Sequence, residues 1–201
     1  MLRIGTSGSA GSADVVICGW RDGRRPRLRT GVKLVFQAGG TLPDLPGLRV
    51  GRRPARGAEE LARALCEGFD VVVAEAGDPA APVVAAGMWH YGWTAGDVGP
   101  LAGATVAGLV LAGLRAPCAL EVRADGGATL DCGSTPGHEV TVADVLAGLA
   151  ARFRSGRYRT PVVTVPLASV RLTQETCSRV RVAPCAGEPV YLAQSGRVQS
   201  V

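Results

Sequence analysis

Short apolar stretches recur along the chain, and most of them are rich in valine. Runs of this length, bounded by Gly, Pro or polar residues, are typical of buried β-strands. The pattern predicts strands at residues 2–5, 32–36, 70–76, 119–125, 128–133, 161–165 and 179–184.

Residues 57–68 (GAEELARALCEG) carry apolar side chains at helical spacing. Leu61 and Leu65 fall on one face, and Glu59 and Glu60 stand in the first turn, where the positive end of the helix dipole favours acidic residues. This stretch therefore predicts an amphipathic helix.

Residues 141–156 predict a second helix. Thr141 followed by Asp144 has the spacing of a capping box, and Val145 and Leu149 continue at helical intervals. Gly156 then marks the end.

Two segments are harder to interpret from the pattern. Residues 82–100 mix glycine with aromatic residues and show no clean period, so we expect a loop or a junction between lobes. For residues 12–20, Val15, Val16 and Ile17 favour a strand. We expect a short helix there instead, because it would supply a normal crossover before the strand at 32–36.

Strands that alternate with helices predict an α/β fold with mixed, largely parallel sheets. The chain has 201 residues, 47% of them hydrophobic and 19% charged, which is a globular balance.

The formal net charge is +5, from 22 basic and 17 acidic residues, and Lys33 is the single lysine. Arginines cluster at residues 21–29, 49–56 and 152–159. Aromatic residues make up 4%, too few for the stacking surfaces of a nucleic-acid binder, so we expect no nucleic-acid partner. The clusters are either solvated surface or a means of holding a small anionic ligand, because guanidinium groups grip carboxylates and phosphates.

The six cysteines include no Cys-x-x-Cys pair, and His90 and His138 are the only histidines, so we expect no metal site. The longest apolar run, residues 101–114, is too short to span a bilayer, and the start lacks a signal-peptide pattern. We therefore expect a cytoplasmic protein with reduced thiols and no membrane partner.

Four places carry candidate chemistry. Thr6, Ser7, Gly8 and Ser9 follow the first predicted strand and could form either an anion-binding turn or an ordinary one.

Glu75 and Asp78 follow the strand at 70–76, at the strand end where α/β proteins place ligands. Asp78 could act as a general acid or stabilise a cation, and its Gly-Asp-Pro context also fits a simple turn. Cys177 could be a nucleophile, an attachment point or a small buried apolar residue. Ser134 and His138 share a loop that shows no third catalytic group.

These pieces together resemble the hydroxymethylbilane synthase (porphobilinogen deaminase) family. The opening LRIGTSGSA is similar to the family's start, and residues 50–79 resemble its Glu-Leu helix and the strand that leads to its catalytic aspartate, with Asp78 at that position. Residues 109–127 and 144–177 resemble later family segments and place Cys177 near the cysteine that carries the dipyrromethane cofactor.

The departures concern the family's chemistry. Ser7 stands where the family has arginine, residues 74–77 replace its His-Ser-x-Lys, and its Thr-Ser-Ser-Leu-Arg-Arg segment has no counterpart. Glu175 and Thr176 replace the glycines before the cysteine. The family's polyanionic product needs many cations, so losing several of them together argues against the standard deaminase reaction. No cofactor is certain, and a dipyrromethane on Cys177 is the candidate that the resemblance implies.

The resemblance implies a periplasmic-binding-protein-like lobe with a reduced second lobe and a small C-terminal α+β part. It divides the chain into residues 1–88, the first part of the lobe, 89–118, a reduced central lobe or junction, 119–160, a return to the first lobe, and 161–201, a small β-rich part.

The resulting hypothesis is a diverged, transferase- or deaminase-like enzyme for a small anionic or pyrrole-like substrate in a specialised biosynthetic pathway. Asp78 would be catalytic, and Thr6, Ser7, Gly8, Ser9 and Glu75 would bind substrate. The alternative is a non-catalytic protein that binds a small ligand or a partner on the same scaffold.

Overall fold

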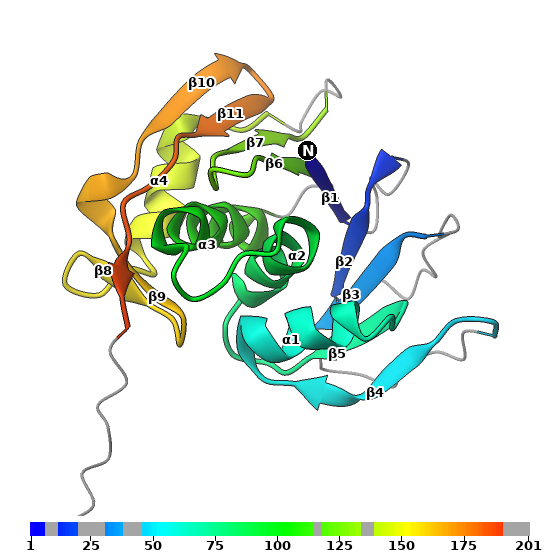
Figure 1. The fold of residues 1–201 in the computed structure, drawn as a ribbon. Helices are drawn as coiled ribbons and strands as arrows, with labels where there is room; N and C mark the ends of the chain where they lie inside the picture. Colours follow the sequence, from blue (N-terminus) through cyan, green and yellow to red (C-terminus); the bar gives the residue numbers. More distant parts are fainter. Residues whose placement is uncertain (7–11, 20–30, 38–45, 115–117, 134–138, 191–201) are drawn as a thin grey trace, which may run out of the picture.

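A sheet of nine strands runs through the molecule in the order β10-β11-β7-β6-β1-β2-β3-β5-β4 (Figure 1). The computed structural model describes residues 1–6, 12–19, 31–37, 46–114, 118–133 and 139–190. Five neighbouring strands are parallel, namely β1 (Leu2–Thr6), β2 (Val15–Gly19), β3 (Lys33–Gln37), β5 (Val71–Ala74) and β4 (Val50–Ala55). The other four pair antiparallel, namely β6 (Ala119–Val122), β7 (Ala128–Asp131), β11 (Arg179–Val182) and β10 (Leu172–Thr176).

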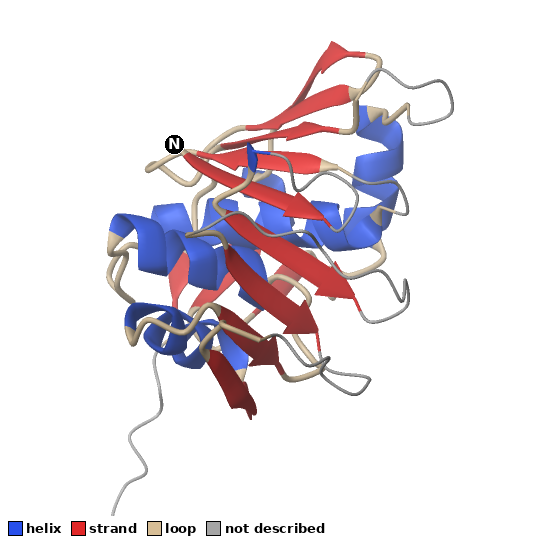
Figure 2. Cartoon of the chain, turned by 90° about the vertical axis from the view of Figure 1, so that its right-hand side faces the viewer, coloured by secondary structure: helices blue, strands red, loops and turns tan. Residues whose placement is uncertain are grey.

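The α-helices of the described residues lie on one face of this sheet (Figure 2). They are α1 (Gly57–Cys66), α2 (Ala81–Tyr91), α3 (Val98–Gly113) and α4 (Val142–Ala150). A second, antiparallel sheet contains β8 (Arg157–Arg159), β9 (Val163–Pro166) and β12 (Glu188–Pro189), with the 3₁₀ turn η3 (Leu167–Ser169) after β9. The expectation of an α/β fold with a mixed sheet is therefore confirmed.

Helix α3 is the centre of the packing. It contacts β6, β7 and β11 of the large sheet and β9 of the small one, as well as α2 and α4. Every residue from Leu101 to Leu111 is buried. A helix enclosed on all sides has no polar face, so its sequence carries no amphipathic period.

The expected loop over residues 82–100 is wrong for this reason. Helix α2 occupies the first half of that segment, and α3 begins near its end. Helix α2 is also apolar around most of its circumference, since residues 81–87 are all buried. The division of the chain into four parts stays a prediction.

The expected short helix in residues 12–20 is also wrong. Val15–Gly19 form β2, which lies between β1 and β3 and is parallel to both. Both faces of this strand are covered, since Val15 belongs to the core beneath the helices and Val16 to a smaller apolar cluster on the opposite face. A strand buried on both sides is apolar without alternation, and the β-branched residues there were the correct signal.

The two predicted helices form as expected. The Thr141 hydroxyl accepts a hydrogen bond from the Asp144 N–H at 3.1 Å, and the Asp144 carboxylate accepts one from the Thr141 N–H at 3.2 Å. This is the predicted capping box at the start of α4. In α1, Leu61 and Leu65 are buried and the acidic pair stands in the first turn.

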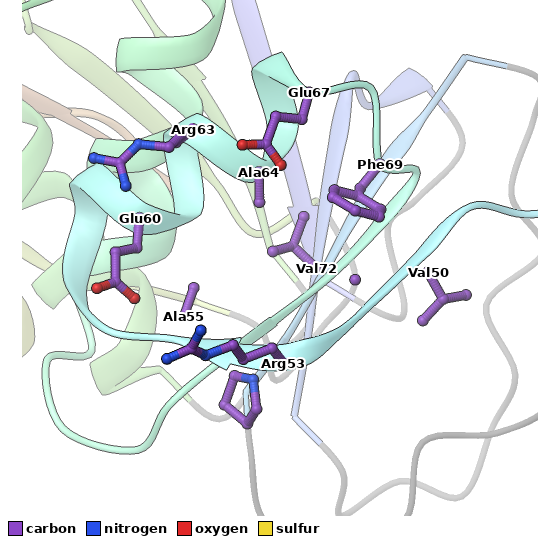
Figure 3. Close-up of a pocket in the computed structure, with 11 residues that line it drawn as sticks. Val50, Arg53, Ala55, Glu60, Arg63, Ala64, Glu67, Phe69 and Val72 are labelled. Carbon is purple, nitrogen blue, oxygen red and sulfur yellow. The ribbon is translucent and has the colours of Figure 1, made fainter.

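Strand β4 forms one edge of the large sheet and departs from β5 in its middle. The register runs from Gly51 opposite Val72 to Ala55 opposite Ala74, so three residues of β4 stand against one of β5. Such a bulge bends the strand away from its neighbour. A hollow of 390 Å³ opens between β4 and α1 at this point (Figure 3).

No helix among the described residues is both long and apolar enough to cross a membrane.

The close packing around α3 depends on glycine. A Cβ on Gly103 would overlap the backbone carbonyl of Gly126, and one on Gly108 would stand 2.8 Å from the Ala80 Cα. These contacts involve backbone atoms, which cannot rotate away. Glycine at these positions therefore allows α3 to lie directly against the turn after β6 and the start of α2.

We expect Gly103→Ala to lower the free energy of unfolding by about 1–3 kcal/mol, because the added methyl group overpacks a rigid contact. Urea denaturation followed by circular dichroism measures the change. Gly148→Ala in α4 is the matched control, since nothing lies within 4 Å of its added Cβ, and it should gain about 0.5–1 kcal/mol from helix propensity. Equal effects of the two substitutions would contradict this account of α3.

Candidate functional site

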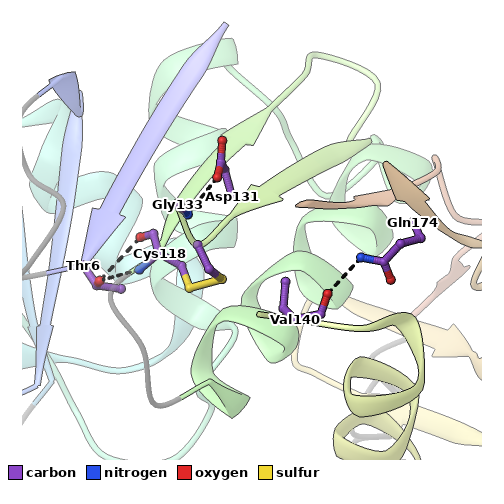
Figure 4. Close-up of a disulfide and its surroundings, with 7 residues drawn as sticks. Thr6, Cys118, Asp131, Gly133, Val140 and Gln174 are labelled. Carbon is purple, nitrogen blue, oxygen red and sulfur yellow. Dashed lines mark hydrogen bonds between the residues drawn. A yellow bond between two sulfur atoms is a disulfide. The ribbon is translucent and has the colours of Figure 1, made fainter. Parts of the chain in front are cut away.

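Thr6 ends β1, and its hydroxyl is committed to the neighbouring backbone. It accepts a hydrogen bond from the Cys118 N–H at 3.1 Å and donates one to the Cys118 carbonyl at 3.4 Å (Figure 4). Thr6 therefore joins β1 to the start of β6 and does not present a free hydroxyl. Ser7, Gly8 and Ser9 lie outside the described residues.

Cys118 forms a disulfide with Cys132 (Figure 4). The two residues stand opposite each other just beyond β6 and β7, so the bond closes the open end of that hairpin. Both cysteines are buried on the helix-covered side of the sheet. The expectation of reduced thiols is wrong for this pair, while the cytoplasmic location stays a prediction.

Asp78 is held by contacts from two directions. Its Oδ1 accepts hydrogen bonds from the Ala80 N–H at 2.9 Å and from the Tyr158 hydroxyl at 3.1 Å. The first bond belongs to the turn that leads into α2, as the Gly-Asp-Pro context predicted. The second comes from β8, 80 residues away in the chain, and nothing in the local sequence indicates it.

Burial raises the pKa of the Asp78 carboxyl, and the hydrogen bonds from Ala80 and Tyr158 oppose this effect. Burial also raises the pKa of Tyr158, and the nearby Asp78 charge adds to the increase. Tyr158 therefore keeps its proton at neutral pH and donates a hydrogen bond to the carboxylate. A titratable pair perturbed in this way is a candidate functional group.

Glu75 belongs to the same strand end but not to this pair. Its carboxylate is exposed and forms an ion pair with Arg56 at 2.9 Å. Glu75 and Asp78 both border a small hollow of 210 Å³ that Pro79 and Pro82 complete. Strands β2 and β3 lie between β1 and β5 in the sheet. At the usual strand spacing, the end of β1 at Thr6 is therefore roughly 14 Å from the end of β5. The structure does not bring the two predicted groups together.

A larger hollow of 440 Å³ lies on the other side of Tyr158. Its walls are Arg152, Arg154, Ser155, Arg157, Tyr158 and Arg159. The arginines are gathered by a tight turn in which Arg154 and Arg157 exchange backbone hydrogen bonds of 3.0 Å. Ser155 and Gly156 both have positive φ, which a two-residue hairpin turn of type I′ requires.

The arginines of this hollow differ in how they are neutralised. Arg157 forms an ion pair with Glu188, and Arg152 donates to the carbonyls of Gly148 and Ala112 near the ends of α4 and α3. The side chains of Arg154 and Arg159 have no hydrogen bond or ion pair within the described part of the chain. Two unpaired guanidinium groups beside a tyrosine make this hollow attractive to an anion.

This grouping explains one of the arginine clusters in the sequence. The segment RFRSGRYR was open to either a solvated or an anion-binding interpretation. Its useful signal is the Ser-Gly turn between alternating arginines, which predicts a hairpin with Arg157 and Arg159 on the face opposite Tyr158.

Cys177 lies in the turn between β10 and β11, at the opposite end of the sheet from β5. Its thiol is exposed, so the alternative of a small buried residue is wrong. The sheet order also keeps Cys177 apart from Asp78. Ser134 and His138 lie outside the described residues.

Within the ranges that the structure describes, no three or more His, Cys, Asp and Glu side chains are arranged to hold a metal ion.

A comparison with protein families matches residues 53–113 to the acyclic terpene utilisation family protein AtuA. The matched segment runs through α1, β5, α2 and α3 and includes Asp78. It covers less than half of the chain. No curated protein and no solved structure matches the sequence.

The resemblance to hydroxymethylbilane synthase is therefore wrong, because the family match points elsewhere over a continuous segment that includes the supposed catalytic strand. The pieces that carried the resemblance were short and separated by gaps, and Gly-, Ala- and Val-rich pieces of this kind recur in α/β folds. The deaminase and transferase chemistry that it implied is dropped with it.

The raised pKa of Asp78 predicts how stability depends on pH. Because the folded chain binds this proton more tightly than the unfolded chain, the wild type should lose stability relative to Asp78→Asn as pH rises from below 3.8 through the folded pKa. Asparagine keeps an oxygen for the Ala80 and Tyr158 bonds, so the comparison isolates the charge. Urea unfolding of both proteins between pH 3 and 7 measures it, and parallel stability curves would rule the shift out.

The disulfide predicts a stability that depends on reduction. The bond closes a loop with a sequence separation of 14, so reducing it should lower the free energy of unfolding by about 3 kcal/mol. The free energy of unfolding in urea, measured with and without dithiothreitol, gives this loss. A Cys118→Ala, Cys132→Ala variant is the control and should not respond to the reductant; an equal response would place the effect elsewhere.

Proposed function

We propose that the chain binds a small anionic molecule in the hollow between Arg152 and Arg159. The observation that carries the proposal is that Arg154 and Arg159 of this hollow have no hydrogen bond or ion pair within the described part of the chain, while Tyr158, on the other face of β8, donates its hydroxyl hydrogen to Asp78. Because the Tyr158 hydroxyl hydrogen is bonded to Asp78, it is not available to an anion in the hollow. Recognition rests on the guanidinium groups.

Several features make the hollow suitable for a compact anion. Its volume of 440 Å³ lies within the usual range for small-molecule sites. The hairpin turn fixes the backbone of Arg154 and Arg157, and Tyr158 packs against Phe153 with ring centroids 5.8 Å apart. A rigid base keeps the ordering cost of binding low.

The name of the matched family concerns acyclic terpene utilisation. The matched segment, residues 53–113, includes none of the arginines of this hollow, so the family name does not bear on its ligand. The finer architecture expected from the sequence, a periplasmic-binding-protein-like lobe with a reduced second lobe, stays a prediction.

Inorganic pyrophosphate and citrate are suitable probes, because both are compact and multiply charged. We expect calorimetry to show binding of at least one of them, weakened about tenfold or more in an Arg154→Gln, Arg159→Gln variant through loss of charge-assisted hydrogen bonds. Arg3→Gln, Arg181→Gln is the matched control: it removes the same two charges at exposed positions of β1 and β11 that border neither hollow, and it should leave the affinity unchanged. Unchanged binding in the double variant would refute the site.

A second candidate function, catalysis by proton transfer, is favoured by the raised pKa of Asp78 behind Tyr158. An anion bound beside this pair should raise the pKa of Asp78 further, so binding should take up protons. Pyrophosphate titrations of the wild type and of Asp78→Asn in buffers of different ionisation enthalpy measure the protons exchanged. The ligand's own proton exchange is common to both proteins, so an excess uptake in the wild type belongs to Asp78. Binding without this excess uptake would leave ligand binding as the function.

A further inference from the structure

The hollow between β4 and α1 is a consequence of the edge strand's bulge. Between Gly51 and Ala55 the strand leaves β5, and Pro54, which has no N–H, stands within the departing stretch. The departure leaves a hollow between the strand and α1, above Val72 of β5. It is lined from the strand, from the helix and from the turn after the helix (Figure 3).

The floor of this hollow is apolar. Val72 of β5 forms its centre, and Ala64, Phe69 and Val50 surround it (Figure 3). Val72 is 1% exposed, whereas Phe69 is partly exposed and has the Arg49 guanidinium over its ring, 5.4 Å from the centroid. This end of the hollow can hold a hydrocarbon body.

The other end is charged. Arg53 on the strand and Glu60 in the first turn of α1 lie on this side, Arg63 follows in the last turn of the helix, and Glu67 borders the hollow just after it (Figure 3). The Glu60 carboxylate accepts a hydrogen bond from the Arg56 N–H at 2.8 Å, which stabilises its charge locally. Arg53 and Arg63 have no side-chain hydrogen bond or ion pair within the residues that the structure describes. Two arginines without a partner, Arg53 and Arg63, therefore stand near one partly satisfied anion, Glu60. Glu67 adds a second negative charge after the helix end, where the Arg49 guanidinium donates to the Glu67 backbone carbonyl at 3.3 Å.

We infer that this hollow binds a small amphiphilic anion, with its apolar body against the partly exposed Phe69 and Val50 and its carboxylate or phosphate near Arg53 and Arg63. The volume of 390 Å³ suits a molecule of this size. The site shares no residue with the arginine hollow at 152–159, so it stands independently of the function proposed above.

Octanoate is the probe, because it joins one carboxylate to a flexible hydrocarbon chain. We expect saturable binding by calorimetry or by NMR shifts, weakened about tenfold in Arg63→Gln and in Arg53→Gln. Glu60→Gln should strengthen binding, because it removes one of the two negative charges that border the hollow while keeping an oxygen for the Arg56 N–H. All three positions are exposed, so these variants should fold.

Chain length tests the apolar floor without a mutation. Hexanoate has two fewer methylenes than octanoate, and each buried methylene contributes about fourfold in affinity. Hexanoate should therefore bind about fifteenfold more weakly. Equal affinities for the two acids would show that the hydrocarbon chain lies outside the hollow.

Two controls decide where the anion lies and which charge is preferred. The Arg154→Gln, Arg159→Gln variant should bind octanoate as the wild type does, and a loss of binding there would assign octanoate to the other hollow and overturn this site. Octylamine carries the opposite charge and should bind more weakly than octanoate. Stronger octylamine binding that Glu60→Gln removes would instead show a cation site and overturn the inference.

Discussion

The structure depends on one helix that has no solvent-facing side. Helix α3 lies between the large sheet and the small one, and its glycines let backbone meet backbone at Gly126 and Ala80. Because the core on both sides is built against this helix, the two sheets are held together by the same set of apolar contacts. A change of one methyl group there is felt in both layers.

The same enclosure limits what the sequence reveals. Helices α1 and α4 each have one solvent-exposed face. The period of their apolar residues and the residues of their first turns therefore predict them from the sequence. Helices α2 and α3 are apolar nearly all round, and their period disappears. The predicted strands form because short Val-rich runs have few alternatives, whereas β2 was misassigned when a preference for a crossover outweighed its β-branched residues.

The candidate site shows a different limit. Asp78 was singled out because it follows a buried strand, and the structure places it beside Tyr158 across 80 residues of chain. Only tertiary packing creates this pair, because nothing in the sequence around either residue indicates that the other is its partner. The arginines that give the hollow its charge were visible as a cluster. Their common orientation depends on the hairpin turn at Ser155 and Gly156.

The disulfide lies in a row of connections that crosses four strands at one level. Thr6 of β1 donates its N–H to Cys118, the disulfide joins Cys118 to Cys132, and Cys132 donates its N–H to Ser178 before β11. Pulling apart any two of these strands at this level therefore requires breaking a covalent bond or a hydrogen bond beside one. In mechanical terms, β1, β6, β7 and β11 are clamped at the end where β1 stops, and the hydrogen-bonded turn between β6 and β7 holds that pair together at its other end as well.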